Sequence, residues 1–181
     1  MHAPITLRPF QPSDQPAAKL LIQQGLGEHF GFIDQTLNPD LDDIAEHYVR
    51  PGHLFVVAEL DGHLVATGAL IGLVPGVAQV VRVSVQSDYR RRGIGRAIVA
   101  LLLQTAYERG FRRVQVETNR TWWDAIGLYT SQGFCEYARD EVSVYLALDL
   151  PAQRETQDPG RPSRRAFLQT FGQPQDGTST R

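Results

Sequence analysis

Two hydrophobic periods alternate along the chain from Ile5 to Leu150, and neither continues beyond Pro151. Alternating, β-branched runs predict strands at 5–8, 54–60, 64–71, 77–85, 113–118 and 142–148. Apolar residues spaced three and four apart predict helices that start near 14 and near 38, a longer helix over 94–109 and a shorter one over 122–131. We therefore expect one domain over 1–150 and a disordered, Pro- and Gln-rich tail over 151–181.

Capping residues mark the starts of the first two helices. Ser13 or Asp14 can cap the first helix, whose apolar face is expected to consist of Ala17, Leu20 and Leu21. The sequence Asn38-Pro39-Asp40 predicts the start of the second helix, because it places a cap before a proline at the first helical position.

The connections between strands predict the topology of the sheet. Asp61-Gly62, between two strand-like runs, predicts a tight antiparallel hairpin. The strands at 77–85 and 113–118 are joined by the long helix, and such a crossover makes them parallel. The last strand, 142–148, is expected at an edge. The fold class is therefore α/β, with a mixed, mostly antiparallel sheet, one central parallel strand pair and helices on both faces.

Composition and charge exclude several classes of partner. The chain has 181 residues, a formal net charge of −2 and 42% hydrophobic positions, so we expect no nucleic-acid partner. No apolar run is long enough to span a bilayer, and the first residues lack the pattern of a secretory signal. We therefore expect no membrane partner and a cytoplasmic location. A single cysteine, Cys135, and five histidines without ligand spacing predict no metal site.

The segment that carries chemistry is Arg90-Arg91-Arg92-Gly93-Ile94-Gly95, between a predicted strand and the long helix. Glycines at such a turn let backbone N–H groups approach an anion, and the helix dipole favours negative charge there. The three arginines add positive charge, so a pyrophosphate is the expected ligand. A P-loop would need a Gly-Lys pair, and a dinucleotide-binding fingerprint would need a third glycine. Both are missing here. A solvated turn without a ligand is the alternative that the residues leave open.

Two motifs in order resemble a known family. The segment 83–95 is similar to motif A of the GNAT superfamily of N-acetyltransferases, whose signature is Q/R-x-x-G-x-G/A. The ten residues from Ala125 to Phe134 resemble its motif B, which ends A-x-x-L-Y-x-x-x-G-F. The resemblance covers roughly Ile5 to Leu150. The sequence of residues 81–85 is similar to that of the branch that contains the N-acetyltransferase-8-like and camello-like enzymes.

This resemblance implies a cofactor and a set of residues that bind it. The cofactor is acetyl-CoA, and its pantetheine arm lies along the backbone of a strand that splays from its parallel neighbour, here Val83, Ser84 and Val85. Its pyrophosphate is wrapped by the turn, here Arg90, Arg91, Arg92, Gly93, Ile94 and Gly95. Many relatives carry an asparagine at the position of Trp122. Either Asn119 replaces it, or Trp122 stacks against the cofactor arm.

The resemblance also implies direct transfer of the acetyl group to a primary amine of a small molecule or peptide. Tyr129 matches the motif-B tyrosine that assists the leaving thiolate, with a packing tyrosine as the alternative. Glu117 is the first candidate for the general base, and Glu28 and His29, expected just beyond the first helix, are second choices. Cys135, without a histidine motif to pair with it, is expected to be a structural thiol.

Three questions stay open in the sequence. An acidic segment would suit a cationic amine, although helix capping explains part of it equally well; its members are Asp34, Asp40, Asp42, Asp43 and Glu46. A homodimer is one arrangement in which the apolar tail residues Phe167, Leu168 and Phe171 could dock. A non-catalytic acyl-CoA-binding sensor on the same fold is the alternative to an enzyme.

Overall fold

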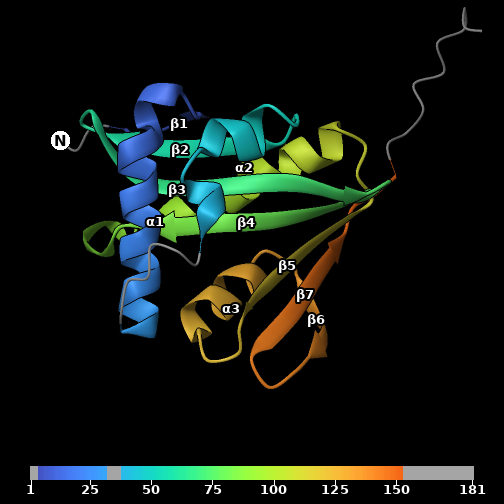
Figure 1. Ribbon diagram of the computed structural model, residues 1–181. Coiled ribbons are helices and arrows are strands. Elements are labelled where there is room, and N and C mark those ends of the chain that lie inside the picture. The colour runs from blue at the N-terminus through green and yellow to red at the C-terminus, as the bar shows by residue number, and fades with distance from the viewer. Residues whose placement is uncertain (1–3, 32–37, 153–181) are drawn as a thin grey trace, which may run out of the picture.

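A seven-stranded sheet with the order β1-β2-β3-β4-β5-β7-β6 runs through the protein. The computed structural model describes residues 4–31 and 38–152 (Figure 1). The strands are β1 (Thr6–Pro9), β2 (Leu54–Leu60), β3 (His63–Val74), β4 (Val77–Val85), β5 (Arg113–Asn119), β6 (Cys135–Arg139) and β7 (Ser143–Asp149). The helices are α1 (Gln15–Phe30), α2 (Ile94–Glu108) and α3 (Trp123–Thr130), with short helical turns η1 (Pro12–Asp14), η2 (Pro39–Leu41), η3 (Ala45–Val49) and η4 (Ser87–Tyr89). The predicted tail lies outside the described residues from 153 onward, together with its apolar docking candidates.

The pairing of the strands confirms the predicted fold class. Neighbouring strands are antiparallel except β4 and β5, which are parallel and joined by the α2 crossover. The prediction that the last strand lies at an edge was wrong, because β7 pairs with β5 on one side and with β6 on the other. The five residues of β6 are all exposed, whereas β7 is largely buried. An exposed strand of this kind fits the edge, and the apolar β7 fits the interior of the sheet.

Helices cover both faces of the sheet, as predicted. One apolar cluster joins α2 and α3 to the sheet and includes Ile98, Leu102 and Tyr129. The other joins α1, η2 and η3 to the opposite face around Phe55. In Figure 1, α1 crosses in front of β3 and β4, while α2 lies behind them. No helix in the described ranges has both the length and the apolar character needed to cross a bilayer.

The first helix differs from its prediction in its cap and its buried face. Asp14 occupies the N-cap position, but its carboxylate accepts hydrogen bonds from Arg8 and from the Gln11 N–H instead of capping α1. The buried apolar residues are Ala18, Leu21 and Ile22, while Ala17 and Leu20 face solvent. Residues 17–22 contain two overlapping sets of apolar residues with helical spacing, and only one of these sets packs against the sheet.

The prediction of a second helix starting near residue 38 was wrong. The chain after Asn38 forms only the 3₁₀ turn η2 and the short π turn η3. The cap and acid that suggested a helix start bind elsewhere, because Asn38 and Asp40 both accept hydrogen bonds from Arg82 of β4. The hairpin prediction is confirmed, since Asp61 and Gly62 both have positive φ between β2 and β3.

The close approach of α2 to β3 at Gly68 gives a test of the packing. A Cβ added at Gly68 would lie under 3.0 Å from Ile98 Cγ2 and 3.3 Å from Leu102 Cδ1, and both side chains are fully buried. Gly68→Ala should therefore lower the free energy of unfolding by about 1–3 kcal/mol. Gly127→Ala is the control, because no atom lies within 4 Å of a Cβ there, and alanine should stabilise α3 by up to about 1 kcal/mol. Urea unfolding checks both, and equal stability of the two variants would contradict the packing.

Candidate functional site

The parting of β4 from β5 creates the candidate site. The two strands pair only at Val77–Arg113, Ala78–Val114 and Gln79–Gln115. Beyond these pairs, β4 continues beside β3 to Val85 and β5 continues beside β7 to Asn119. Figure 1 shows the two strands diverging toward α3. The gap opens into a cleft of about 1150 Å³, which is lined by Tyr129, by Glu117 and by every predicted cofactor residue except Arg92. Glu28, a second choice for the base, does not line it.

The backbone of β4 faces this gap at alternate residues. The Gln86 N–H bonds the Val65 carbonyl on β3 at 2.9 Å. Because N–H and C=O groups in an antiparallel pair alternate between the two sides of a strand, those of Val83 and Val85 turn away from β3 toward the gap. Ser84 lies between them, opposite Thr67 of β3. The predicted cofactor strand therefore directs backbone groups toward a ligand in the cleft, and of these the Val85 carbonyl already accepts a hydrogen bond from Arg90.

The turn before α2 has the geometry of an anion site. Arg91 and Gly93 both have positive φ, at 62° and 83°, which bends the chain sharply into the helix. The first intrahelical bond of α2 runs from the Ala97 N–H to the Gly93 carbonyl at 3.0 Å. The N–H groups of the first turn, including those of Ile94 and Gly95, therefore have no intrahelical acceptor and point out of the helix end. They can bind phosphate oxygens at the positive end of the helix dipole.

The side chains of the three arginines are used differently from one another. Arg90 donates to the Val85 carbonyl at 2.9 Å and forms an ion pair with Glu28 of α1. Arg91 is almost fully exposed and lies 3.5 Å from Asp124. Arg92 stacks over the ring of Tyr89 and is the predicted cofactor residue that does not line the cleft. The turn itself, more than the arginine side chains, forms the cradle.

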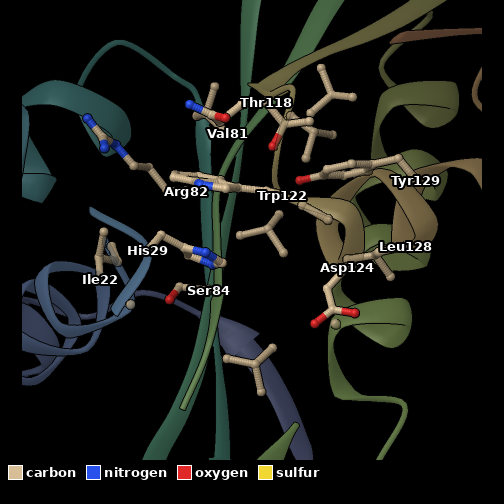
Figure 2. A pocket seen from close by; sticks show the side chains of 18 of the residues that line it. Ile22, His29, Val81, Arg82, Ser84, Thr118, Trp122, Asp124, Leu128 and Tyr129 are labelled. Carbon is tan, nitrogen blue, oxygen red and sulfur yellow. The ribbon is translucent and has the colours of Figure 1, made fainter. Parts of the chain in front are cut away.

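Tyr129 lies on α3 with its ring buried and its hydroxyl directed into the cleft. The side chain is 6% exposed and packs edge-on against Phe134, with ring centroids 5.6 Å apart. Burial raises the pKa of Tyr129 well above its ordinary value, so the phenol stays protonated. Figure 2 shows its oxygen pointing toward Trp122 and Thr118. A neutral hydrogen-bond donor therefore faces the gap.

Glu117 lines the cleft from the opposite face of β5. Val116 and Thr118 are buried on the face that packs toward Tyr129, so Glu117 between them projects from the other face. The Ser143 hydroxyl donates to Glu117 Oε1 at 2.8 Å, which orients the carboxylate. Among the carboxylates of the described residues that line the cleft, Glu117 is the one without an ion pair.

Trp122 and Asn119 both line the cleft, and each already has partners. The Trp122 ring stacks on His29, with centroids 4.3 Å apart, and meets Phe30 edge-on. The Asn119 side-chain oxygen accepts hydrogen bonds from the Thr121 N–H and hydroxyl. His29 lies in the last turn of α1 and not beyond it, so that part of its prediction was wrong. The aromatic pair joins α1 to the start of α3 across the cleft (Figure 2).

Sequence reasoning missed a polar cluster on β4. Arg82 donates to Asp40 through Nε and Nη2, at 2.9 and 2.5 Å. It also donates to Asn38 through Nη1 and to the Tyr48 hydroxyl through Nε. The available signal was a single charged residue inside the apolar run Val80-Val81-Arg82-Val83. Asp40, Tyr48 and Arg82 all line the cleft.

The acidic segment is largely neutralised by its neighbours. Asp40 pairs with Arg82, Asp42 pairs with Lys19, and Glu46 pairs with Arg50. The Asp43 carboxylate accepts the Glu46 N–H at 2.8 Å, while Asp34 lies outside the described residues. The segment therefore offers less negative charge to a cationic amine than its sequence suggests.

Cys135 lies on the exposed edge strand and does not line the cleft. In residues 4–31 and 38–152, no three His, Cys, Asp or Glu side chains are grouped in a way that could hold a metal ion. Among these described residues, the side chains that line the cleft include hydroxyls, the polar groups of Gln79, Asn119 and His29, and charged groups of which several are paired.

A mixed sheet that parts at one parallel pair, with an anion-binding turn beside the gap, is the architecture that the two motifs predict. A model of the Acetyltransferase (GNAT) family matches residues 21–134, and the chain belongs to this family. It is 28% identical to the uncharacterized N-acetyltransferase YjgM of Escherichia coli over 67% of this chain and 76% of that one. It is 35% identical to human N-acetyltransferase 8B over 65% of this chain and 54% of that one. The chain thus spans about half the length of the latter relative.

Solved structures share the fold. An acetyltransferase of the GNAT family from Staphylococcus aureus superimposes with a TM-score of 0.76 at 22% identity, covering 82% of this chain and all of that one. The PaiA N-acetyltransferase of Thermoplasma acidophilum, solved in complex with coenzyme A, superimposes with a TM-score of 0.72 at 15% identity over 82% of this chain and all of that one. These similarities confirm the predicted family fold.

Tyr48 makes the stability of this site dependent on pH. Burial, followed by its hydrogen bond to Asp40, raises the pKa of Tyr48 from about 10 to about 12. The folded protein holds this proton more tightly, so the contribution to stability is complete below about pH 10 and is lost as the pH rises to about 12. We expect the free energy of unfolding to fall by up to about 3 kcal/mol over that range. Urea titrations of the parent and Tyr48→Phe measure it, and an equally steep fall in both would contradict the assignment.

Proposed function

We propose that the protein transfers the acetyl group of acetyl-CoA directly to a primary amine of a small molecule or peptide. The observation that carries this proposal is the gap between β4 and β5, which begins after Gln79 and Gln115 and has the Arg90–Gly95 turn at its wide end. Family membership supports the reaction class, and the coenzyme A in the PaiA structure supports the choice of cofactor.

The residues present fit such a cofactor. The first turn of α2 offers N–H groups to a pyrophosphate, and a Cβ at Gly93 would meet no atom within 4 Å, so the space in front of the turn is open. The backbone edges of Val83 and Val85 can hydrogen-bond the amides of a pantetheine arm. When bound, acetyl-CoA would supply the acetyl thioester that the amine attacks.

Glu117 is the residue we assign to the amine. A primary amine must lose a proton before it attacks, and a carboxylate within reach, directly or through a water, can take it. Glu117 faces the cleft without a cationic partner among the described residues, and the Ser143 hydroxyl orients it. Glu28, a second choice from the sequence, is already paired with Arg90.

Tyr129 is the residue we assign to the leaving sulfur. Because Tyr129 lies on α3, which packs against the face of β5 opposite to Glu117, the two side chains approach the gap from different sides. The raised pKa of Tyr129 lies above that of a thiol, so complete proton transfer is uphill. We therefore assign hydrogen-bond donation as its main contribution.

An assay of thiol release tests the function. Purified protein is incubated with acetyl-CoA and a panel of primary amines that includes amino acids, arylalkylamines, polyamines and an alanine-initiated peptide. Acetylation of at least one class, identified by mass spectrometry of the product, is expected. Tight binding of coenzyme A without turnover of any amine would contradict the proposal.

Gly93→Val should weaken the binding of coenzyme A at least tenfold, about 1.4 kcal/mol. Valine is strained at φ 83°, so the turn that directs its N–H groups toward the phosphates must change. Gly52→Val is a matched control, because Gly52 has φ 84° and an equally open surrounding but lies outside the cleft. Calorimetry measures both affinities. An equal loss in the two variants would attribute the effect to general strain.

Tyr129→Phe should lower kcat while the KM for acetyl-CoA changes little, because only the hydroxyl is lost and the ring still packs against Phe134. General acid assistance contributes about 10²–10⁴-fold, and the low end is expected for a thiolate. Single-turnover measurements separate the chemical step from product release. A single-turnover rate within about threefold of the parent would make Tyr129 a packing residue and remove it from the mechanism.

A further inference from the structure

Arg82 is a charged residue in the middle of an apolar strand, and the reaction proposed above does not use it. It lies on the part of β4 that has already parted from β5, two residues before Ser84. Its side chain is 22% exposed and that of its partner Asp40 is 21% exposed. A charge buried to this extent is retained at a cost in desolvation, so the contacts that it makes call for an explanation.

The backbone at Arg82 is shaped to direct this side chain. Gly68 of β3 faces two residues of β4, Arg82 and Val83, which form a bulge in the ladder. Arg82 adopts φ 57°, in the left-handed region that is unfavourable for a residue other than glycine. The buried Thr67 hydroxyl donates to the Arg82 carbonyl at 2.9 Å and fixes this conformation.

The guanidinium then binds the chain that enters η2. Its Nε and Nη2 donate to the two oxygens of Asp40, and its Nη1 donates to Asn38 Oδ1 at 2.8 Å. Tyr48 of η3 joins the network, since its hydroxyl donates to Asp40 and accepts from Arg82. A bidentate pair fixes orientation as well as distance. Three points of the segment 38–48 are therefore held against one residue of β4.

This network stands at the end of the cleft away from the phosphate turn. Arg82 follows the last parallel pair by three residues, whereas the turn begins beyond the end of β4. Asp40, Tyr48 and Arg82 all line the cleft. In Figure 2, Arg82 extends on the opposite side of Trp122 from Tyr129. The wall that the network holds in place is thus remote from the turn that would hold the cofactor's pyrophosphate, which leaves this end of the cleft to the amine.

We propose that Arg82 is a positioning residue of the acceptor site, which fixes the segment 38–48 against β4 so that amine binding depends on it while cofactor binding does not. The inference rests on the proposed acetyl transfer to an amine. Because Arg82 is already paired with Asp40, it acts through the position of this wall and not through its own charge. A displaced wall loses contacts that the amine makes in the ground state as well as in the transition state, so the KM for the amine rises.

The kinetic test compares two arginines that each bind both oxygens of an aspartate, one in the lining of the cleft and one outside it. Arg82→Lys keeps the charge but cannot form the two-pronged pair with Asp40. It should raise the KM for the best amine of the panel at least fivefold and leave the KM for acetyl-CoA within twofold. Arg8→Lys is the matched control, because Arg8 also binds both oxygens of a buried aspartate, Asp14, at 2.7 and 2.9 Å but does not line the cleft. It should lower the melting temperature without changing either KM.

A milder variant keeps the proposal testable if Arg82→Lys does not fold. Tyr48→Phe removes one hydroxyl of the network and retains the ring that packs against Phe55. It should raise the amine KM in the same direction by a smaller factor. Hydrogen exchange of the amides in 39–49, compared with those in 90–96, provides a readout that needs no substrate. Both network variants should speed exchange in the first range alone.

The outcomes separate the two proposals. Turnover in the parent with an unchanged amine KM in a folded network variant would overturn the role of Arg82 and leave the enzyme assignment standing. Equal changes in the KM for amine and for acetyl-CoA would make the network a general support of the fold and would also overturn the inference. A parent that turns over no amine would count against the proposed function, and unchanged exchange in 39–49 would then overturn the positioning role independently.

Discussion

The loss of pairing between β4 and β5 after Gln79 and Gln115 is the constraint on which the rest of the structure depends. An interrupted ladder exposes backbone N–H and C=O groups on both strands, and these groups need partners. Each strand keeps its other neighbour, so the sheet is opened without being divided. Some of these exposed backbone groups are hydrogen-bonded by side chains of the protein itself, as when Arg90 donates to the Val85 carbonyl. The remaining ones form a polar edge along a cleft, which is a binding surface that an unbroken sheet would not possess.

The anion site beside this gap follows from backbone geometry more than from the run of arginines. Positive φ at Arg91 and Gly93 turns the chain into α2 so that the first N–H groups point outward. Arg90 instead ties the turn to α1 through Glu28, which holds the cradle in place. In the proposed function, charge at the turn would attract a phosphate and the amides would fix its position. The glycine at 93 is explained by its φ of 83° and not by crowding, since a Cβ there would meet no atom within 4 Å.

The features that could be predicted from sequence are those determined by residues close together in the chain. The Asp61-Gly62 hairpin, the α2 crossover and the turn at Gly93 each follow from local chemistry, and the structure contains all three. The wrong predictions depended on distant partners. Asn38 and Asp40 look like a helix start because their side chains can cap, but Arg82 of β4 competes for them. Likewise, β7 is interior because β6 folds back to cover it, which the alternation of β7 alone does not indicate.

The same competition decides the electrostatics of the cleft. From the sequence alone, Asp40 is a negative charge that would suit a cationic amine. In the structure, both of its carboxylate oxygens accept hydrogen bonds from Arg82 or Tyr48. An ion pair attracts a distant cationic amine more weakly than a single carboxylate does, since its two fields largely cancel at long range. Glu117 is hydrogen-bonded by an uncharged serine hydroxyl and has no ion pair, unlike the other described carboxylates of the cleft. The unpaired carboxylate thus lies two residues beyond the last β4–β5 pair, which is where the proposed reaction needs a base.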